Sequence, residues 1–362
     1  MVDKEKIKFE PDYTVSPGEI LEESLDARGL KKKEFAKRCM LSDKTISQII
    51  NGKAPITPDT AIRFERILGV AAAVWNNLES NYRLHKAKIS NHENLGNWIT
   101  WAKKFPIPEI VQRGIIERPT NPIDAVEKLL NFFAVGSIEA WQDKFKELKA
   151  NFMHSQTFKS EPESVASWLR IGEIRAEGID TAHFNKTKFI SALYEIRKLT
   201  YKHPNEFEPK MTQLCSDSGI ALVFVSELPN THLSGATRWL SKDKALIILS
   251  LRHKSNDHFW FSFFHEAAHI IKHGKKQTFL DEVNMTLTKE EKEANQIAAN
   301  ILIPEPEYKE FIRQNKIYRQ DIMNFARRVG IAPGIVVGRL QHDEIIPYTW
   351  HNNLKRKFVL TE

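Results

Sequence analysis

The sequence has few cysteines and no long apolar runs. Only Cys39 and Cys215 occur among 362 residues, too few for a disulfide framework or a zinc site built on cysteines. The uninterrupted apolar stretches are far shorter than the roughly 20 residues of a membrane-spanning helix, and the first residues do not form a signal-peptide pattern. We therefore expect a cytoplasmic protein without membrane attachment, in which histidine and carboxylate side chains hold any metal.

The composition is that of an ordinary globular protein. Hydrophobic residues make up 41% of the chain and charged residues 27%, which excludes disorder throughout. At about 100–200 residues per domain, a chain of this length should form two or three domains, each large enough to bury its own core.

Basic residues are concentrated near the N-terminus. The whole chain has 53 basic and 46 acidic residues and a net charge of +7, but ten lysines and arginines stand against only four acids between Arg28 and Arg66. Such a patch is typical of proteins that bind the phosphate backbone of nucleic acids. On charge alone, a solvated lysine-rich helix face is the more ordinary explanation.

The first 85 residues read as an all-helical domain. Ser16 precedes a proline and begins the first helix, and a short second helix is expected at 31–38. The tight connection 39–41 separates it from a third helix at 43–51, and two more helices follow. The sequence therefore predicts a helix, a three-residue turn and a second helix within a compact unit.

The rest of the chain divides into a helical region and a mixed region. Residues 86–205 are mostly helical in period and contain no catalytic signature, so we interpret them as a helical connector. Residues 206–362 should form a separate domain that contains a small sheet. Three β-rich segments are expected to form this sheet, at 219–227, 236–240 and 245–251.

A helix at 257–273 contains a metal-binding pattern. Phenylalanine and tryptophan occur on all its sides, so it must be buried. His265 and His269 lie one helical turn apart and can share one Zn²⁺, while Glu266 lies beside them, where it can take a proton from water at the metal. Burying these polar side chains among aromatic rings is costly unless they bind a metal or form hydrogen bonds. The metal site is favoured over a pair of hydrogen-bonded core histidines.

A third protein ligand is needed, and the next helix offers three glutamates. Glu290, Glu291 and Glu293 all border its apolar face. Glu291 follows Thr288 by three residues, so a capping box explains it without a metal, and periodicity does not choose between the other two. His273 is a weaker candidate because it lies one further turn along the helix axis.

The C-terminal region resembles the ImmA/IrrE family of zinc metallopeptidases, whose members cleave repressor proteins. The resemblance rests on the strands that begin at Gly219, on residues 265–269 and on residues 293–304. It implies a zincin-like domain with Zn²⁺ held by His265, His269 and Glu293, and with Glu266 as the catalytic base. The pentapeptide departs from the family's usual pattern by having two alanines where Leu-Gly is common.

The N-terminal domain resembles Xre-type helix-turn-helix proteins and, more narrowly, HigA-like antitoxins. The matching segments are 16–21, 47–52, 56–58 and 75–82, and the resemblance implies a lambda-repressor-like fold. Four outward residues of the third helix can reach base edges: Asp43, Lys44, Ser47 and Gln48. Three further residues can hold phosphates: Lys32, Asn51 and Lys53. The alternative is a helical module that docks proteins.

These observations predict a mainly α protein with a small β-sheet (α+β) and two functions. We expect residues 1–85 to bind double-stranded operator DNA as a homodimer, and residues 206–362 to be a zinc endopeptidase that cleaves a regulatory protein. The protein partner would be a substrate or a cognate toxin. The alternative is a repressor or antitoxin whose zinc domain acts as a sensor or docking surface without cleaving.

Overall fold

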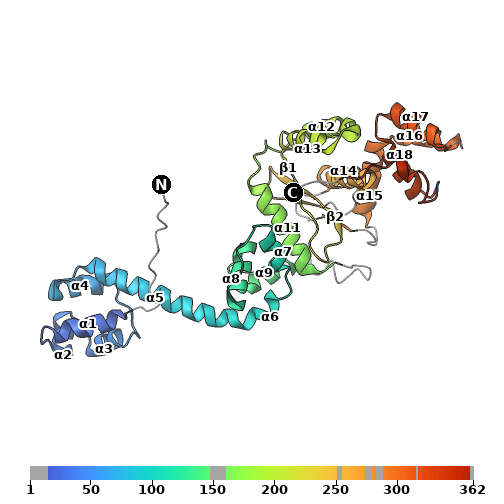
Figure 1. Cartoon of the computed structure of the whole chain (residues 1–362). Coiled ribbons are helices and arrows are strands. Elements are labelled where there is room, and N and C mark those ends of the chain that lie inside the picture. The colour runs from blue at the N-terminus through green and yellow to red at the C-terminus, as the bar shows by residue number, and fades with distance from the viewer. Residues whose placement is uncertain are drawn as a thin grey trace, which may run out of the picture. The chain divides into compact units, whose positions relative to one another are not determined.

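The computed structural model describes residues 15–146, 160–250, 255–273, 279–282, 288–314 and 317–358. The chain forms two compact units, Met1–Ile99 and Thr100–Glu362, which are coloured blue to cyan and cyan to red in Figure 1. None of the described helices combines the length and the apolar character that crossing a membrane requires.

The described part of the first unit is entirely helical. Its helices are α1 (Pro17–Asp26), α2 (Lys32–Arg38), α3 (Asp43–Ile50), α4 (Pro58–Leu68) and α5 (Ala72–Leu95), followed by the 3₁₀ turn η1 (Gly96–Trp98). Three of them begin at hydroxyl caps: the side chains of Ser16, Ser42 and Thr57 accept hydrogen bonds from backbone N–H groups of the first turn. The predicted helix, three-residue turn and helix are confirmed as α2, residues 39–41 and α3 with its cap Ser42.

Aromatic side chains hold these helices together. The Phe35 ring lies 5.0 Å from that of Phe64, which lies 5.6 Å from the ring of Trp75 in an edge-to-face arrangement. All three side chains are fully buried, as are Leu21 and Ile46. Each helix therefore contributes to one core, which fixes α3 on the unit with its polar face outward.

The start of α1 packs closely on the end of α3. A Cβ at Gly18 would overlap the carbonyl oxygens of Ile49 and Ile50. Backbone atoms cannot move aside as a flexible side chain can, so only glycine permits this approach. The contact fixes how α3 is presented.

We expect Gly18→Ala to destabilise the first unit by about 1–3 kcal/mol, because the added methyl group forces α1 and α3 apart. Gly96→Ala is the matched control. Gly96 has a helical φ of −56°, and no atom outside its immediate surroundings lies within 4 Å of the point that an alanine methyl group would occupy, so alanine there should be neutral or slightly stabilising. Chemical denaturation followed by circular dichroism measures both, and equal stabilities of the two variants would contradict the packing argument.

The described part of the second unit combines helices with a four-stranded sheet. Its helices are α6 (Ile99–Ala102), α7 (Ile107–Gln112), α8 (Pro122–Phe133), α9 (Ile138–Lys144), α11 (Pro162–Glu177), α12 (Lys186–Lys198), α13 (Pro204–Ser216), α14 (Asn256–Lys272), α15 (Lys289–Leu302), α16 (Glu305–Arg313), α17 (Arg319–Val329) and α18 (Pro333–His342), with 3₁₀ turns η2 (Leu199–Tyr201) and η3 (Asn352–Leu354). The strands are β1 (Ile220–Phe224), β2 (Leu233–Trp239), β3 (Ala245–Leu249) and β4 (Phe279–Glu282).

The sheet has the order β1-β3-β2-β4. Strands β1 and β3 are parallel, and the other neighbouring pairs are antiparallel. The three predicted strands are therefore confirmed, although β2 begins earlier than expected and β4 was not predicted. The fold class, mainly helical with a small sheet, is also confirmed.

Residues 86–205 differ from the expected connector. Helix α5 continues through residue 85 to Leu95, and the division between units falls at residue 99. Helix α11 packs against β1 and β3, where Trp168 Nε1 donates a hydrogen bond of 3.0 Å to the carbonyl of Val225. Helices α12 and α13 also belong to the second unit. The prediction that this region is helical is confirmed. The spacing of apolar residues along a helix does not indicate which part of the fold that helix packs against.

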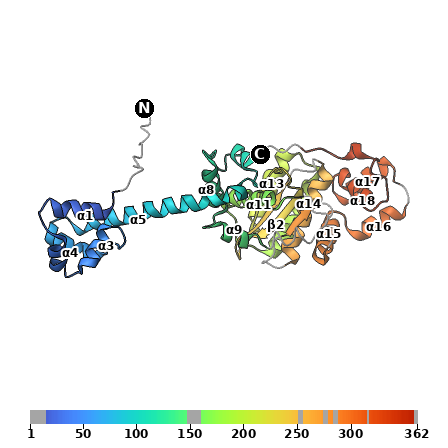
Figure 2. The same cartoon turned by 90° about the horizontal axis from the view of Figure 1, so that it is seen from below.

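Helix α14 lies in the centre of the second unit. It contacts β2 and β3 on one side and α15 and α18 on others, and Figure 2 shows it beside β2. Phe263, Phe264 and Trp260 are fully buried, as the all-round apolar pattern predicts. Its polar residues are consequently enclosed as well.

Candidate metal centre and candidate nucleic-acid interface

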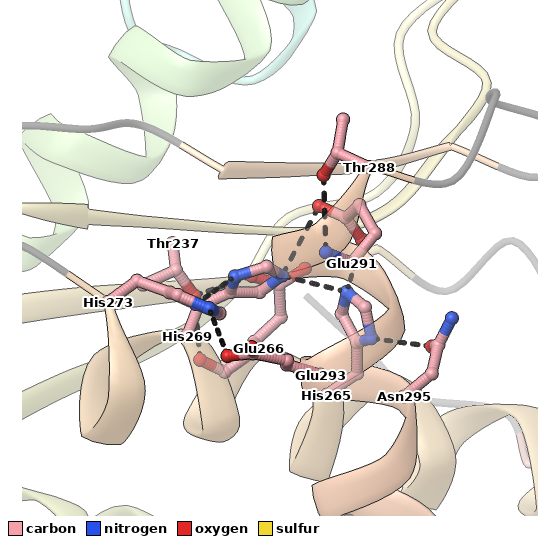
Figure 3. A network of polar contacts seen from close by, with 9 residues as sticks. All are labelled: Thr237, His265, Glu266, His269, His273, Thr288, Glu291, Glu293 and Asn295. Carbon is pink, nitrogen blue, oxygen red and sulfur yellow. Dashed lines mark hydrogen bonds and ion pairs between the residues drawn. The ribbon is translucent and has the colours of Figure 1, made fainter.

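Helix α14 brings His265 and His269 to one point. Because they are one helical turn apart, their rings lie on the same face, and their Nε2 atoms are 3.0 Å apart. Each histidine is only 1% exposed. Figure 3 shows both rings facing the first turn of α15.

Glu291 supplies the acidic group at this pair. Its Oε2 lies 3.1 Å from His265 Nε2, and its Oε1 lies 3.4 Å from His269 Nε2. The backbone N–H of Glu291 donates to the Thr288 hydroxyl, which caps α15. The cap predicted for Thr288 is thus present, but the Glu291 carboxylate is turned to the histidines instead of completing a capping box.

Glu293, expected as the third ligand, is placed elsewhere. Its Oε2 lies 3.7 Å from His273 Nε2, and its side chain is 35% exposed. Two residues along a helix correspond to a rotation of about 200°, so Glu291 and Glu293 cannot both face the histidine pair. Within the described residues, the group that could hold a metal ion is His265, His269 and Glu291.

A sequence signal for Glu291 exists in the spacing of α15. The buried residues Ala294, Ala298 and Leu302 form one stripe along the helix, and Glu291 continues that stripe by one turn toward the N-terminus. In the sequence analysis, Glu291 was explained by a capping box with Thr288 and was therefore not chosen as a metal ligand. The small alanines allow α15 to pack closely against α14.

The geometry fits a tetrahedral metal ion. Zn–N and Zn–O bonds of about 2.0–2.1 Å place neighbouring ligand atoms about 3.3 Å apart, and the distances within the triad are 3.0, 3.1 and 3.4 Å. Two imidazoles and one carboxylate leave a fourth position for water or substrate. The buried donor set therefore suits a catalytic rather than a closed structural site.

Asn295 and His273 orient the two histidines; the sequence assigned no role to Asn295 and made His273 only a weaker candidate for the third ligand. His265 Nδ1 is hydrogen-bonded to Asn295 Oδ1 at 2.9 Å, so Nδ1 carries the proton and Nε2 is left as the ligand atom. His269 Nδ1 lies 3.0 Å from His273 Nδ1, and Glu293 contacts the far nitrogen of that ring. His273 and Glu293 thus form an outer layer behind His269.

Burial and neighbouring charges favour the metal-binding protonation states of Glu291 and His269. Burial raises the pKa of Glu291, but the hydrogen bonds and charges of His265 and His269 outweigh it and lower this pKa to about 2. Burial lowers the pKa of His269 below its ordinary value. Glu291 is consequently a carboxylate, and the His269 imidazole is neutral near pH 7.

Glu266 lies against strand β2. Its Oε2 accepts a hydrogen bond of 2.5 Å from the Thr237 hydroxyl, and a Cβ at Gly235 would lie 2.7 Å from its Oε1. A side chain at position 235 would therefore displace the carboxylate. Neither Thr237 nor Gly235 was assigned a role from sequence, because strand-to-helix proximity has no local sequence signature.

The predicted base-reading residues lie on the surface of α3, and Asn51, an expected phosphate-binding residue, lies at its end. Asp43, Lys44, Ser47 and Gln48 are exposed. Asn51 is also exposed, and its side-chain amide donates to the carbonyl of Ser47 at 2.7 Å. The structure thus presents a continuous polar face on a rigid helix.

The two expected phosphate-binding lysines are both exposed. Lys32 Nζ lies 2.5 Å from Glu22 Oε1 in a solvent-exposed ion pair, which contributes little to stability and is easily exchanged. Lys53 follows α3, and its backbone N–H donates to the carbonyl of Gln48. Arg63 donates to the carbonyl of Cys39 at 2.9 Å and so supports the turn between α2 and α3.

The first unit is similar in sequence to known helix-turn-helix proteins. The helix-turn-helix family model matches residues 21–75. The uncharacterized HTH-type transcriptional regulator YddM of Escherichia coli (strain K12) is 35% identical over 72 residues, which are 20% of this chain and 77% of that protein. The chain belongs to the helix-turn-helix family.

Two further relatives match the same domain of this helix-turn-helix protein. Virulence-associated protein I of Dichelobacter nodosus is 39% identical over 75 residues, covering 20% of this chain and 69% of that protein. The structure of the Pseudomonas aeruginosa antitoxin HigA with the higBA promoter is 31% identical and covers 23% of this chain and 90% of that one, with a TM-score of 0.22.

The second unit contains an IrrE N-terminal-like domain. The family model matches residues 215–341, from the end of α13 to α18. This range includes Glu266 and the residues of the triad. The helix-turn-helix protein therefore carries its candidate metal centre in a peptidase-type domain.

The contacts around the triad distinguish the two glutamates of α15. Glu291→Ala should lower the affinity for Co²⁺ about 100-fold or more because it removes a ligand. Glu293→Ala should lower it only about tenfold, because only an outer contact to His273 is lost. Titration followed by the visible absorption of Co²⁺ measures both affinities. If the Glu293 variant is the weaker binder, the assignment of the third ligand must be reversed.

Proposed function

We propose that this helix-turn-helix protein is a transcription regulator that binds operator DNA and carries a zinc-dependent endopeptidase. The observation that carries the peptidase proposal is the buried triad of His265, His269 and Glu291 with Glu266 beside it. Two imidazole nitrogens and one carboxylate in tetrahedral reach suit Zn²⁺. The partner is a regulatory protein as substrate, or a cognate toxin.

Each residue has a separate chemical task in this proposal. When bound, zinc would polarise the scissile carbonyl and lower the pKa of water toward about 7. Glu266 accepts the proton of that water and passes it to the leaving amine. Thr237 holds the Glu266 carboxylate by its hydrogen bond, and Asn295 holds the His265 ring.

The DNA-binding proposal rests on the exposed polar face of α3. Its residues Lys44 and Gln48 would contact base edges in the major groove, and Lys53 would contact phosphates. One such unit buries too little surface for tight recognition. We therefore propose a homodimer on a palindromic operator with half-sites about one helical turn apart.

A second candidate function is a metal-binding domain that docks proteins without cleaving them. The complete burial of Glu266 and the near-complete burial of both histidines favour this candidate, since a peptide must gain access to them before it can be cleaved. The two functions differ in whether Glu266 acts as a base.

Substitutions on α3 should separate base reading from phosphate binding. Gln48→Ala should reduce the preference for the operator over other DNA, whereas Lys53→Ala should weaken binding to all sequences and reduce the salt slope by about 1. Lys86→Ala, an exposed lysine of α5, is the control. Fluorescence anisotropy at several salt concentrations measures these effects, and unchanged operator preference in the Gln48 variant would reject α3 as the base-reading helix.

Glu266→Gln should abolish cleavage while preserving metal and DNA binding. It removes the proton acceptor but retains a similar shape, so we expect a rate loss of about a hundredfold or more. Mass spectrometry of a peptide library incubated with the zinc-loaded protein measures cleavage, and Glu293→Gln serves as the control. Cleavage that persists undiminished in the Glu266 variant excludes it as the base, and no cleavage in the unaltered protein favours the docking function.

A further inference from the structure

A cavity of about 420 Å³ lies between α14, α15, α18 and the segment that follows α18. Its size is within the range of ligand-binding cavities in proteins. Among the described residues that line it, none belongs to the metal-binding triad. Asn295 lines the cavity and is hydrogen-bonded to His265 Nδ1, whereas Glu291 faces Nε2 on the other side of that ring. The cavity is therefore a feature separate from the candidate metal centre.

Much of the cavity wall is apolar. Ala299, Leu302, Ile303 and Ile335 all line it, and each is 6% exposed or less. Phe261 adds an aromatic ring from α14. Hydrocarbon gains free energy when it is buried against such a wall, whereas a polar group loses its water there without gaining hydrogen bonds. The body of an occupant should consequently be apolar.

One part of the wall is a closed polar network. Lys355 Nζ lies 2.6 Å from Asp257 Oδ2 and donates a hydrogen bond of 2.7 Å to Gln341 Oε1. The side chains of Lys355 and Asp257 are only 15% and 6% exposed. Their opposite charges offset one another within the protein. This pair therefore contributes little to the attraction of a charged ligand.

Lys292 lines the cavity from the outer face of α15 and is not neutralised in this way. It is exposed, and within the described residues it forms no ion pair. Its neighbours three and four positions away on the helix are Thr288, Lys289, Asn295 and Gln296, and none of them is acidic. Helical ion pairs form at this spacing, so the charge of Lys292 remains available to a ligand.

Arg339 lines the cavity from α18 and is held in one orientation. Its Nε lies 2.7 Å from Asp343 Oδ2, and its guanidinium lies over the ring of Tyr308, 5.1 Å from the centroid. These contacts engage Nε and leave the two terminal amino groups as the donors that a carboxylate can use. Together with the pair described above, the described lysines and arginines of the wall exceed the carboxylates that neutralise them by one charge, that of Lys292.

We propose that this cavity binds a small monocarboxylate with an apolar body, of the medium-chain fatty acid or arylalkanoic acid class. The apolar wall receives the hydrocarbon, and Lys292 and Arg339 receive the carboxylate. A cationic amphiphile is repelled by these two residues, and a neutral one lacks the ionic contact. The inference does not rest on the proposed peptidase function. It gives the protein a ligand site of its own beside the metal centre.

Three compounds with the same hydrocarbon chain test the head group: octanoate, 1-octanol and octylamine. Isothermal titration calorimetry on the full-length, zinc-loaded protein measures their affinities. We expect octanoate to bind about tenfold or more tightly than 1-octanol, and octylamine to bind more weakly than either. Saturating acetohydroxamate, which chelates the metal, should leave octanoate binding unchanged. If acetohydroxamate displaces octanoate, the carboxylate is bound at the metal and the inference is overturned.

Two substitutions test the position of the site. Lys292→Glu changes an exposed side chain, so the fold is retained, and it should weaken octanoate binding about tenfold or more while leaving 1-octanol binding unchanged. Lys309→Glu is the matched control, because Lys309 is an exposed lysine of α16 that is not among the described lining residues. It should retain the affinities of the unaltered protein. Ala299→Phe narrows the cavity and should weaken the binding of both compounds.

The outcomes are distinct. Equal affinities of the three compounds, or an equal loss of octanoate binding in the Lys292 and Lys309 variants, reject the carboxylate contact. Undiminished binding in a folded Ala299→Phe variant shows that the compounds bind outside this cavity. Should that variant fail to fold, as circular dichroism would reveal, the comparison of Lys292→Glu with Lys309→Glu still decides the question.

Discussion

The second unit depends on the burial of three polar side chains in an apolar helix. His265, Glu266 and His269 are enclosed by the sheet and by neighbouring helices, and each buried polar group needs a partner to offset its lost hydration. Thr237 donates a hydrogen bond to Glu266. Asn295 is hydrogen-bonded to His265, and His273 to His269. The surrounding elements are thereby constrained to present hydrogen-bonding groups at fixed points.

Close packing makes these contacts possible. The alanines of α15 let it approach α14, and Gly235 lets β2 approach Glu266. A cavity lies farther along the same pair of helices and is also bordered by α18 and the segment that follows it. The positions of the metal ligands follow from the contact between α14 and α15.

The first unit folds around a hydrophobic core of its own. Its core is built from Phe35, Phe64 and Trp75 and is complete within the unit, so the conformation of α3 does not depend on the metal centre. The apolar side of α3, which carries Ile46 and Ile49, is buried in that core, so its polar face is exposed. Two different chemistries thus reside in units that each fold around a separate hydrophobic cluster.

The sequence determined the elements whose signals are local. Helix caps such as Ser42, the apolar periodicity of α3 and the one-turn spacing of His265 and His269 depend on neighbours a few residues away, so they were readable without a structure. Three of the four strands in the described residues were equally evident. The tertiary structure alone decided that Glu291 and not Glu293 faces the histidines, that α11 covers the sheet, and that Thr237 and Asn295 contact the site. The reason is physical: these contacts depend on the rotation of a helix about its axis and on which layers meet, and both are fixed by packing between segments distant in the sequence.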